Sequence, residues 1–295
     1  HQRPCSDRVE NLTFPLYRPS FLFYLVCTPC TPMFANKKIQ NRNTFKLRML
    51  TVITIILFFA IWQFVVDNGI VDSRTLPSPL KIYEAFLMKM TKKAPDGNLL
   101  SVNIIASLQI SLSGFFSAVI IGVPLGLVMG WYKVLDKILT PIFEIIRPIP
   151  PVAWIPIVVV WMGVGFRAKV LIIFFSAFVP CVINSYTGIQ MTNKTFINVS
   201  KTYGASNFVN FIKVGIPSSL PMVMTGIKIA LGNSWSTLVA AEMLAASAGL
   251  GFMIQMGRQF ARADVVVLGM VIIGVLGAIL SFIFSSLEKY LLRWK

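Results

Sequence analysis

The sequence predicts an all-α, polytopic membrane protein with six transmembrane helices. Three observations predict this fold class. The 295 residues are 56% hydrophobic and only 13% charged, whereas soluble domains carry about 25% charge. The apolar residues are gathered into runs of about 20, which is the length a helix needs to cross about 30 Å of hydrocarbon. The basic residues lie between these runs, as they do in the cytoplasmic loops of membrane proteins.

The charge of the chain is strongly positive, with 27 basic residues against 11 acidic ones and a net charge of +16. In a soluble protein this excess would indicate a nucleic-acid partner. In a membrane protein it is explained by topology, so we expect no nucleic-acid partner. The single histidine, at position 1, argues against a histidine-based active site or metal site, and we expect neither a catalytic residue nor a bound metal.

The first predicted span, residues 50–66, follows a segment in which five basic residues occur without an acid. This flank predicts a cytoplasmic N-terminus. Further apolar runs predict spans at 104–131, 138–162, 170–189, 220–241 and 265–287. Six spans return the C-terminus to the cytoplasm.

The loops agree with this orientation with one exception. The 67–103 segment mixes acidic and basic residues, as expected outside, and its amphipathic stretch 80–89 predicts a surface helix. The 190–217 segment carries three lysines and no acid, as expected inside. The 163–169 loop is the exception, because Arg167 and Lys169 fall on the outer side without an acid.

Two sequence features indicate how the spans bend and pack. The prolines at 148, 150 and 151 must break or kink the third span, either as a hinge or as a static kink, because proline lacks a backbone N–H. Just before them, Glu144 and Arg147 can pair on one helix face. In the second span, a stripe of small residues permits close helix packing, either within the chain or between subunits: Gly122, Gly126 and Gly130.

The first 32 residues differ from the rest. They hold three of the four cysteines, and their apolar run at 21–27 is too short to span a membrane. We interpret Met33 as the natural start, so that 1–47 is an N-terminal extension and cytoplasmic segment and 48–295 the membrane domain. The lone Cys27-x-x-Cys30 pair, without a neighbouring histidine or second pair, is a weak signal for metal or thiol chemistry.

Four polar residues in the predicted fifth span are candidates for a translocation path: Lys228, Asn233, Thr237 and Glu242. Lys228 lies about 15 Å beyond Pro217, near the middle of the membrane, and must therefore face protein or water. It either attracts an anion or holds a gate, or it has a structural role, as a member of an ion pair or as a lysine whose ammonium group snorkels to the membrane interface. Small polar residues also commonly bind helices together. We expect the four side chains to share roughly one face.

The 190–217 loop predicts a short amphipathic helix, a turn near Gly204 and a second helical piece that Pro217 ends. Two interpretations of this loop remain open. It can lie on the membrane with its apolar face in the headgroups. Alternatively, it can dock its apolar side chains into a groove on a soluble partner.

Residue by residue, this loop resembles the EAA loop of the permeases of binding-protein-dependent ABC importers. That motif is Glu-Ala-Ala, three residues, Gly, nine residues and Ile-x-Leu-Pro, and here Gly204 is followed after nine residues by Val214-x-Ile216-Pro217. Over about residues 48–295, further segments resemble the nitrate, sulfonate and taurine branch in the same order: LPSP at 76–79, RPIPPVAWIP at 147–156, WMGVG at 161–165, LVAAEML at 238–244 and GLG at 249–251.

The loop departs from the family motif at one place. Asn198-Val199-Ser200 stands where the family has Glu-Ala-Ala. A glutamate there would complement the positive end of the docking helix, whereas Asn198 can cap the helix but brings no charge. The resemblance implies that the coupling residues are Asn198, Val199, Ser200, Tyr203, Gly204, Ala205, Phe208, Val214, Ile216 and Pro217.

The resemblance also implies the wider assembly. It implies one N-terminal helix plus the five-helix core of a type I importer permease, in a bacterial inner membrane with both termini cytoplasmic. Two permease copies would line the pathway, an extracytoplasmic solute-binding protein would deliver the solute, and ATP and magnesium would bind a separate ATPase subunit. This chain has no GxxxxGK[ST] phosphate loop, so we expect it to hold no cofactor and to be no enzyme.

The implied cargo is a sulfonate, taurine, nitrate or a similar anion, or a thiamine-precursor pyrimidine. The sequence does not choose among these solutes, because in this architecture much of the selectivity would belong to the binding protein. A stand-alone channel or secondary carrier, which needs no ATPase, is the alternative. A membrane enzyme is a more distant one, because no cluster of histidine, cysteine or carboxylate residues gathers at one membrane face.

Overall fold

The computed structural model describes residues 37–69, 72, 76–245 and 247–292. The predictions for residues 1–32, including the Cys27-x-x-Cys30 pair and the start at Met33, lie outside these residues. The chain divides into two units, 1–57 and 58–295, of which the first contributes only the beginning of one helix to the described structure. The predicted domain boundary after residue 47 stays a prediction.

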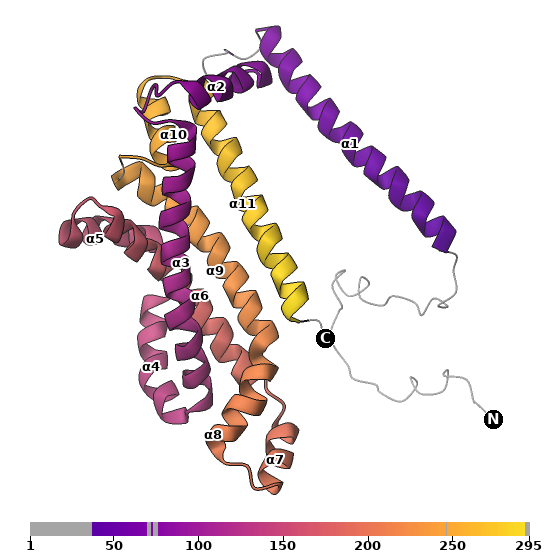
Figure 1. Cartoon of the computed structure of the whole chain (residues 1–295), viewed down its shortest axis with the longest axis vertical. Helices are drawn as coiled ribbons and strands as arrows, with labels where there is room; N and C mark the ends of the chain where they lie inside the picture. Colours follow the sequence, from indigo (N-terminus) through magenta and orange to yellow (C-terminus); the bar gives the residue numbers. More distant parts are fainter. Residues whose placement is uncertain (1–36, 70–71, 73–75, 246, 293–295) are drawn as a thin grey trace, which may run out of the picture. The chain divides into compact units, whose positions relative to one another are not determined.

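Every regular element in the described residues is helical (Figure 1). In chain order the elements are α1 (Lys37–Asp67), α2 (Pro79–Thr91), α3 (Leu100–Trp131), α4 (Lys133–Ile146), η2 (Pro151–Trp154), α5 (Ile155–Met162), α6 (Phe166–Gln190), α7 (Lys194–Thr202), α8 (Asn207–Asn210), η3 (Phe211–Gly215), α9 (Ile216–Ala245), α10 (Leu250–Gln259) and α11 (Ala263–Leu291).

The predicted all-α membrane fold is confirmed. Among the described residues, five helical runs are long and apolar enough to cross a membrane: 49–67 in α1, α3, α6, 207–244 through α8, η3 and α9, and α11. The remaining predicted span, the third along the chain, is the pair formed by α4 and η2–α5, which is bent by 85° at its break. The break falls at the prolines of 148–151, as expected from residues that lack a backbone donor. Counting this bent pair as one span gives six.

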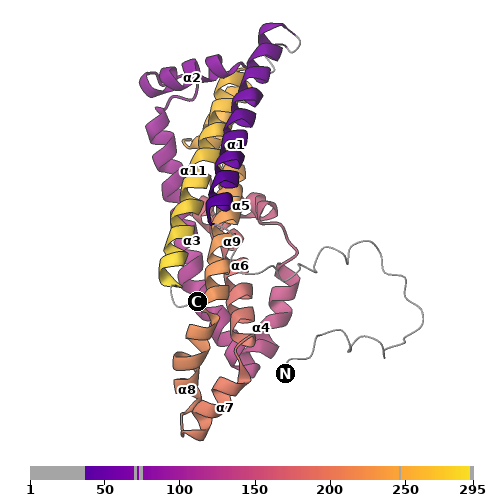
Figure 2. The same cartoon turned by 90° about the vertical axis from the view of Figure 1, so that its right-hand side faces the viewer.

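The spans of residues 58–295 pack around α3, α6 and α9, while α11 and α10 lie against α9 (Figure 1). At their centre lies a buried apolar cluster from these three helices: Phe115, Ala118, Ala177, Cys181, Ala230 and Leu231. In both views α2 lies at one end of the bundle and α7 and α8 at the other (Figures 1 and 2). The α4–α5 break lies between these ends, where α5 projects sideways from the bundle.

The small-residue stripe on α3 lets α6 approach closely. A Cβ atom on Gly122 would lie 3.1 Å from the Cβ of Cys181, and one on Gly130 would lie 2.9 Å from the Tyr186 carbonyl oxygen. One on Gly126 would lie 2.8 Å from the Cβ of Ser185. The stripe therefore serves packing within this chain.

The structure corrects three sequence predictions. Pro217 does not end a helical piece, because it falls in the first turn of α9, where a missing N–H is tolerated. The wide turn η3 precedes it, with the Ile216 N–H bonded to the Phe211 carbonyl. Lys169 is a buried residue of α6 and not a loop residue. It is therefore no longer one of the two outer-loop charges noted as an exception at 163–169. Helix α10 is not predicted, because its ten residues are too short and too mixed to form an apolar run.

We expect Gly126→Ala to destabilise the chain by about 1–3 kcal/mol, because the added methyl group overpacks the contact with α6. The midpoint of thermal unfolding of the purified chain in detergent should fall by several degrees. Gly274→Ala in α11 is the matched control, because a Cβ there meets no atom within 4 Å. Equal midpoints for the two variants would contradict this account of the stripe.

Candidate functional site

The loop between α6 and α9 folds as a capped helix followed by a turn. Asn193 caps α7, and its side-chain oxygen accepts a hydrogen bond from the Thr195 N–H at 2.9 Å. Asn198 lies in the middle of α7 and is exposed, so the capping role expected for it belongs to Asn193. The reason is that α7 begins four residues before Asn198, at Lys194.

The turn after α7 depends on Gly204. Its φ angle is +80°, a left-handed conformation that residues with a Cβ adopt only under strain. The Gly204 N–H bonds to the Lys201 carbonyl at 2.9 Å and the Ala205 N–H to the Ser200 carbonyl at 3.2 Å. Ser206 then caps α8 through its hydroxyl. The predicted helix and turn are thus present, and they are held by specific hydrogen bonds.

Large apolar side chains are exposed along α7 and α8. Tyr203 is 87% exposed, and Phe196, Val199 and Phe208 are each more than half exposed. We call these four residues the α7–α8 apolar patch. Large apolar side chains exposed together at one end of a bundle are typical of an interaction site. The other loop candidates Val214 and Ile216 are half-buried, while Pro217 is exposed beside them.

Aromatic packing ties this loop to the membrane bundle. Phe211 of η3 is buried, and its ring centroid lies 5.5 Å from that of Trp131 and 6.1 Å from that of Tyr132, at the end of α3. A Cβ on Gly215 would lie 2.9 Å from the Trp131 ring. The base of α9 is therefore packed directly against the end of α3.

Asn198 lines a cleft of about 370 Å³ beside α7. Its walls come from the ends of α3 and α6 and the start of α4, and they include Lys133, Lys194 and Lys201. No acidic residue lines the cleft. The absence of the family glutamate at position 198 thus leaves this cleft wholly basic.

The four path candidates of α9 do not share one face. A helix turns about 100° per residue, so the five-residue steps from Lys228 to Asn233 and from Thr237 to Glu242 each rotate the side chain by about 140°. Asn233 and Thr237 therefore lie on one side of α9, and Lys228 and Glu242 on the other. The expectation of a single face was wrong for this reason.

The side chains on the two sides of α9 have different contacts. Lys228 forms an ion pair with Glu288 of α11, and Glu242 is fully buried. On the other side, the Thr237 hydroxyl lies 2.8 Å from the Ser176 hydroxyl of α6. Asn233 is exposed to the cavity between α9, α6 and the α4–α5 break. Their role in a translocation path stays a prediction.

Glu242 is held by three helices. Its carboxylate accepts hydrogen bonds from the Ser107 hydroxyl of α3, at 2.8 and 2.9 Å, and from the Gly251 N–H of α10, at 2.9 Å. The Ser107 hydroxyl in turn accepts from the Leu250 N–H at 2.8 Å. Lys169 of α6 adds an attractive charge interaction with the carboxylate. These hydrogen bonds and the nearby cation offset part of the cost of burying this charge.

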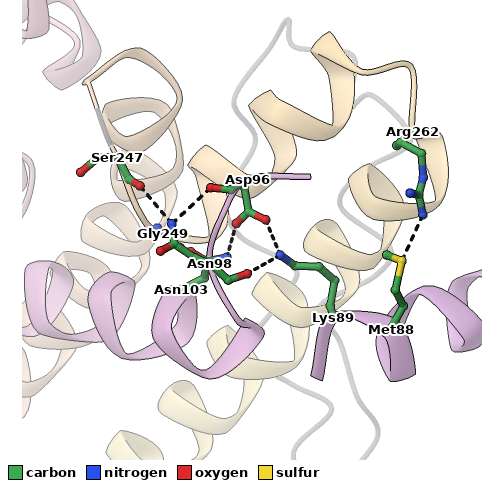
Figure 3. A network of polar contacts seen from close by, with 8 residues as sticks. All are labelled: Met88, Lys89, Asp96, Asn98, Asn103, Ser247, Gly249 and Arg262. Carbon is green, nitrogen blue, oxygen red and sulfur yellow. Dashed lines mark hydrogen bonds and ion pairs between the residues drawn. The ribbon is translucent and has the colours of Figure 1, made fainter. Parts of the chain in front are cut away.

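A second buried polar network lies at the α2 end (Figure 3). Lys89 and Asp96 form an ion pair, and neither side chain is exposed to solvent. The Asn103 amide donates to the other Asp96 oxygen at 2.6 Å, while its own oxygen accepts from the Gly249 N–H at 3.1 Å. The Asn98 side chain donates to the Ser247 carbonyl at 3.1 Å.

This Lys89–Asp96–Asn103 network joins the α2–α3 loop to the α9–α10 turn. Sequence reasoning missed it, because Lys89 and Asp96 read as ordinary charges of a mixed outer loop. The one available signal is that Asn103 and Ser107 are polar positions at the start of an otherwise apolar span, four residues apart and so on one helix face.

Residues 122–295 match the family model described as "Binding-protein-dependent transport system inner membrane component". The taurine transport system permease protein TauC of Escherichia coli is 34% identical over 248 residues, which cover 83% of this chain and 89% of that protein.

Two further relatives have comparable similarity. The nitrate import permease protein NrtB of Synechocystis sp. is 30% identical over 80% of this chain and 86% of its own length. The putative aliphatic sulfonates transport permease protein SsuC of Bacillus subtilis is 31% identical over 81% of this chain and 85% of its own length.

A solved structure supports the fold. An inward-facing structure of the MetNI methionine ABC transporter includes a chain that aligns with a TM-score of 0.56 at 21% identity, covering 65% of this chain and 95% of that one. At this identity the likeness concerns the fold alone.

We expect Asp96→Ala to destabilise the chain by about 3–5 kcal/mol, because it leaves the buried Lys89 ammonium without a counter-charge. The double variant Lys89→Met with Asp96→Ala should recover most of this loss, since it removes both charges. Thermal unfolding of the two purified variants beside the wild type measures the difference. A double variant as unstable as the single one would contradict the assignment.

Proposed function

We propose a cargo and a coupling route for this chain, which belongs to the family of binding-protein-dependent transport system inner membrane components. It is a multi-pass membrane permease of the nitrate, sulfonate and taurine branch of ABC importers. The cargo that we propose is a small oxyanion of this kind. The names of the relatives support this cargo, because taurine, aliphatic sulfonates and nitrate all carry a compact oxyanion group.

The proposed energy source is a separate ATP-hydrolysing subunit that docks on the α7–α8 apolar patch. The observation that carries this proposal is the exposure of Tyr203, at 87%, beside the fixed turn at Gly204. Aromatic side chains of this kind are the residues that most often anchor a protein interface. The basic cleft at Asn198 adds a second contact, since it suits an acidic group on the partner.

Movement of the docked loop would reach the membrane helices by two routes. One route is covalent, because η3 continues directly into α9. The other is the aromatic contact of Phe211 with Trp131, which links the loop to α3. Closure of the ATPase dimer would therefore rock α3 and α9 together, a rigid-body switch between two packings.

We further propose the orientation and the remaining partners. The α7–α8 end would lie in the cytoplasm together with both termini, in a bacterial inner membrane, since three lysines and no acid occupy the 190–217 loop. Helix α2, at the opposite end (Figure 2), would face the solute-binding protein. A second copy of this chain would complete the pathway, as the family implies.

The test is co-purification of the ATPase subunit of the same transport system with the full chain. We expect the double variant Tyr203→Ala with Phe208→Ala to lower its recovery more than about tenfold, because such anchors contribute about 2 kcal/mol or more to an interface. The matched control is Tyr83→Ala with Phe282→Ala, which removes one exposed tyrosine and one exposed phenylalanine from α2 and α11.

Two outcomes would contradict the proposed coupling. One is unchanged recovery of the ATPase with the Tyr203→Ala, Phe208→Ala chain. The other is uptake of taurine or nitrate by liposomes that contain this chain alone without ATP, which is the behaviour of a channel or secondary carrier.

A further inference from the structure

The break between α4 and α5 borders a cavity of about 160 Å³. Its walls come from the end of α4, from η2, from residues 175–180 of α6 and from Asn233 of α9. A water molecule needs only about 10–15 Å³ of such space. The cavity therefore has room for a small anion together with water.

The cavity lies at mid-depth of the bundle. Helix α6 has 25 residues and is therefore about 37 Å long, slightly more than the thickness of the hydrocarbon layer. Ser176 and Phe178, which line the cavity, lie close to its middle. A solute crossing the membrane along α6 would pass this level.

Arg147 lines this cavity, and its side chain is exposed and forms no ion pair with another described residue. Its expected partner Glu144 does not pair with it, although Arg147 keeps helical backbone angles at the end of α4. The ion pairs found in the described part of the chain join other residues, and no acidic residue lines the cavity. An arginine at this depth requires water or an anion beside it.

Two other donors in the cavity wall are also unpaired. Neither the Asn233 side-chain amide nor the Trp154 indole N–H has a hydrogen-bond partner among the described residues. Trp154 is held in place by stacking on Phe175, with ring centroids 5.4 Å apart and an interplanar angle of 21°. The residues that line the cavity thus include one with a guanidinium group and two with neutral N–H donors that no described residue pairs with.

The position of Asn233 is fixed by the contact between α6 and α9. The Ser176 hydroxyl donates to the Asn233 carbonyl at 3.1 Å and lies 2.8 Å from the Thr237 hydroxyl. These bonds satisfy the hydroxyl groups at this level and leave the amide of Asn233 for a ligand. A guanidinium group and N–H donors without competing acids are the chemistry that binds oxyanions.

We propose that Arg147, Asn233 and Trp154 form an anion-binding site inside the membrane, which holds the nitrate or sulfonate group of the cargo as it crosses. This inference rests on the proposed function, because it assumes that the cargo is an anion. It deepens that function by assigning part of the substrate recognition to the permease itself. It also assigns the positive charge of the pathway to Arg147. The earlier candidate Lys228 is instead paired with Glu288.

The first test measures the charge around Asn233 in the purified full chain, without any partner. Asn233→Cys is made in a chain whose native cysteines are replaced, with Cys5→Ser, Cys27→Ser, Cys30→Ser and Cys181→Ala. An anionic sulfonate-bearing methanethiosulfonate reagent is compared with its cationic trimethylammonium counterpart. We expect the anionic reagent to react faster, and 50 mM methanesulfonate, a concentration on the order of that needed for weak binding, to slow the reaction.

Arg147→Gln in the same background should lower the ratio of anionic to cationic rates by about tenfold or more, since it removes a positive charge that lines the same cavity as the cysteine. It should also abolish protection by methanesulfonate. Arg167→Gln is the control, because it removes an exposed arginine that does not line the cavity. An unchanged ratio in the Arg147→Gln chain would overturn the site.

The second test measures uptake of labelled taurine, methanesulfonate and nitrate by the complete importer in proteoliposomes with ATP. We expect Arg147→Gln to lower uptake of the transported anion about tenfold or more, while co-purification of the ATPase is unchanged and Arg147→Lys keeps part of the uptake. Full uptake by Arg147→Gln would overturn the site and leave the proposed function standing. A wild-type importer that takes up none of these anions would contradict the proposed function instead, and the cysteine reactivity would still decide the site.

Discussion

The interior of a membrane offers no water to a backbone N–H or carbonyl group, and every other feature of this chain depends on that constraint. Long helices such as α3, α6 and α9 meet it by bonding nearly all of these groups within the same segment, although each contains an interior proline that removes one helical bond. The α4–α5 break is where the constraint is relaxed, and there the exposed backbone must lie against protein or water. It lies beside α6 and α9 and borders a cavity.

Several charged side chains of the bundle follow the same constraint. Lys89 meets Asp96, Lys228 meets Glu288, and Glu242 is surrounded by hydroxyl and amide donors. These pairs join α2 to the α2–α3 loop, α9 to α11, and α9 to α3 and α10, so they fix how the bundle is assembled. Arg147, at the α4–α5 break, takes part in no ion pair within the described part of the chain. A charge without a structural partner is a candidate for function.

The spans could be predicted because each one is a continuous run of apolar residues in the sequence. The α7 helix and its turn could be predicted from the spacing of the residues around Gly204. The partners of the polar residues could not be predicted in this way. Lys228 and Glu288 are far apart in sequence, so neither predicts the other, and the four polar residues of α9 were assigned one face although five-residue steps place them on two. Family resemblance supplied the coupling loop, but it gave no information on which side chains meet.

The helical run from residue 207 to residue 244 is 38 residues long, which makes it a lever arm of about 57 Å. Its lower end carries Phe208 of the α7–α8 apolar patch, and its upper end carries Glu242. A tilt of about 5° at one end would displace the other by about 5 Å, which is more than a hydrogen bond can stretch. The hydrogen bonds of Glu242 to Ser107 and Gly251 can therefore persist during such a tilt only if α3 and α10 move with α9. The Glu242 end of α9 and its neighbours in α3 and α10 would then move as one rigid unit.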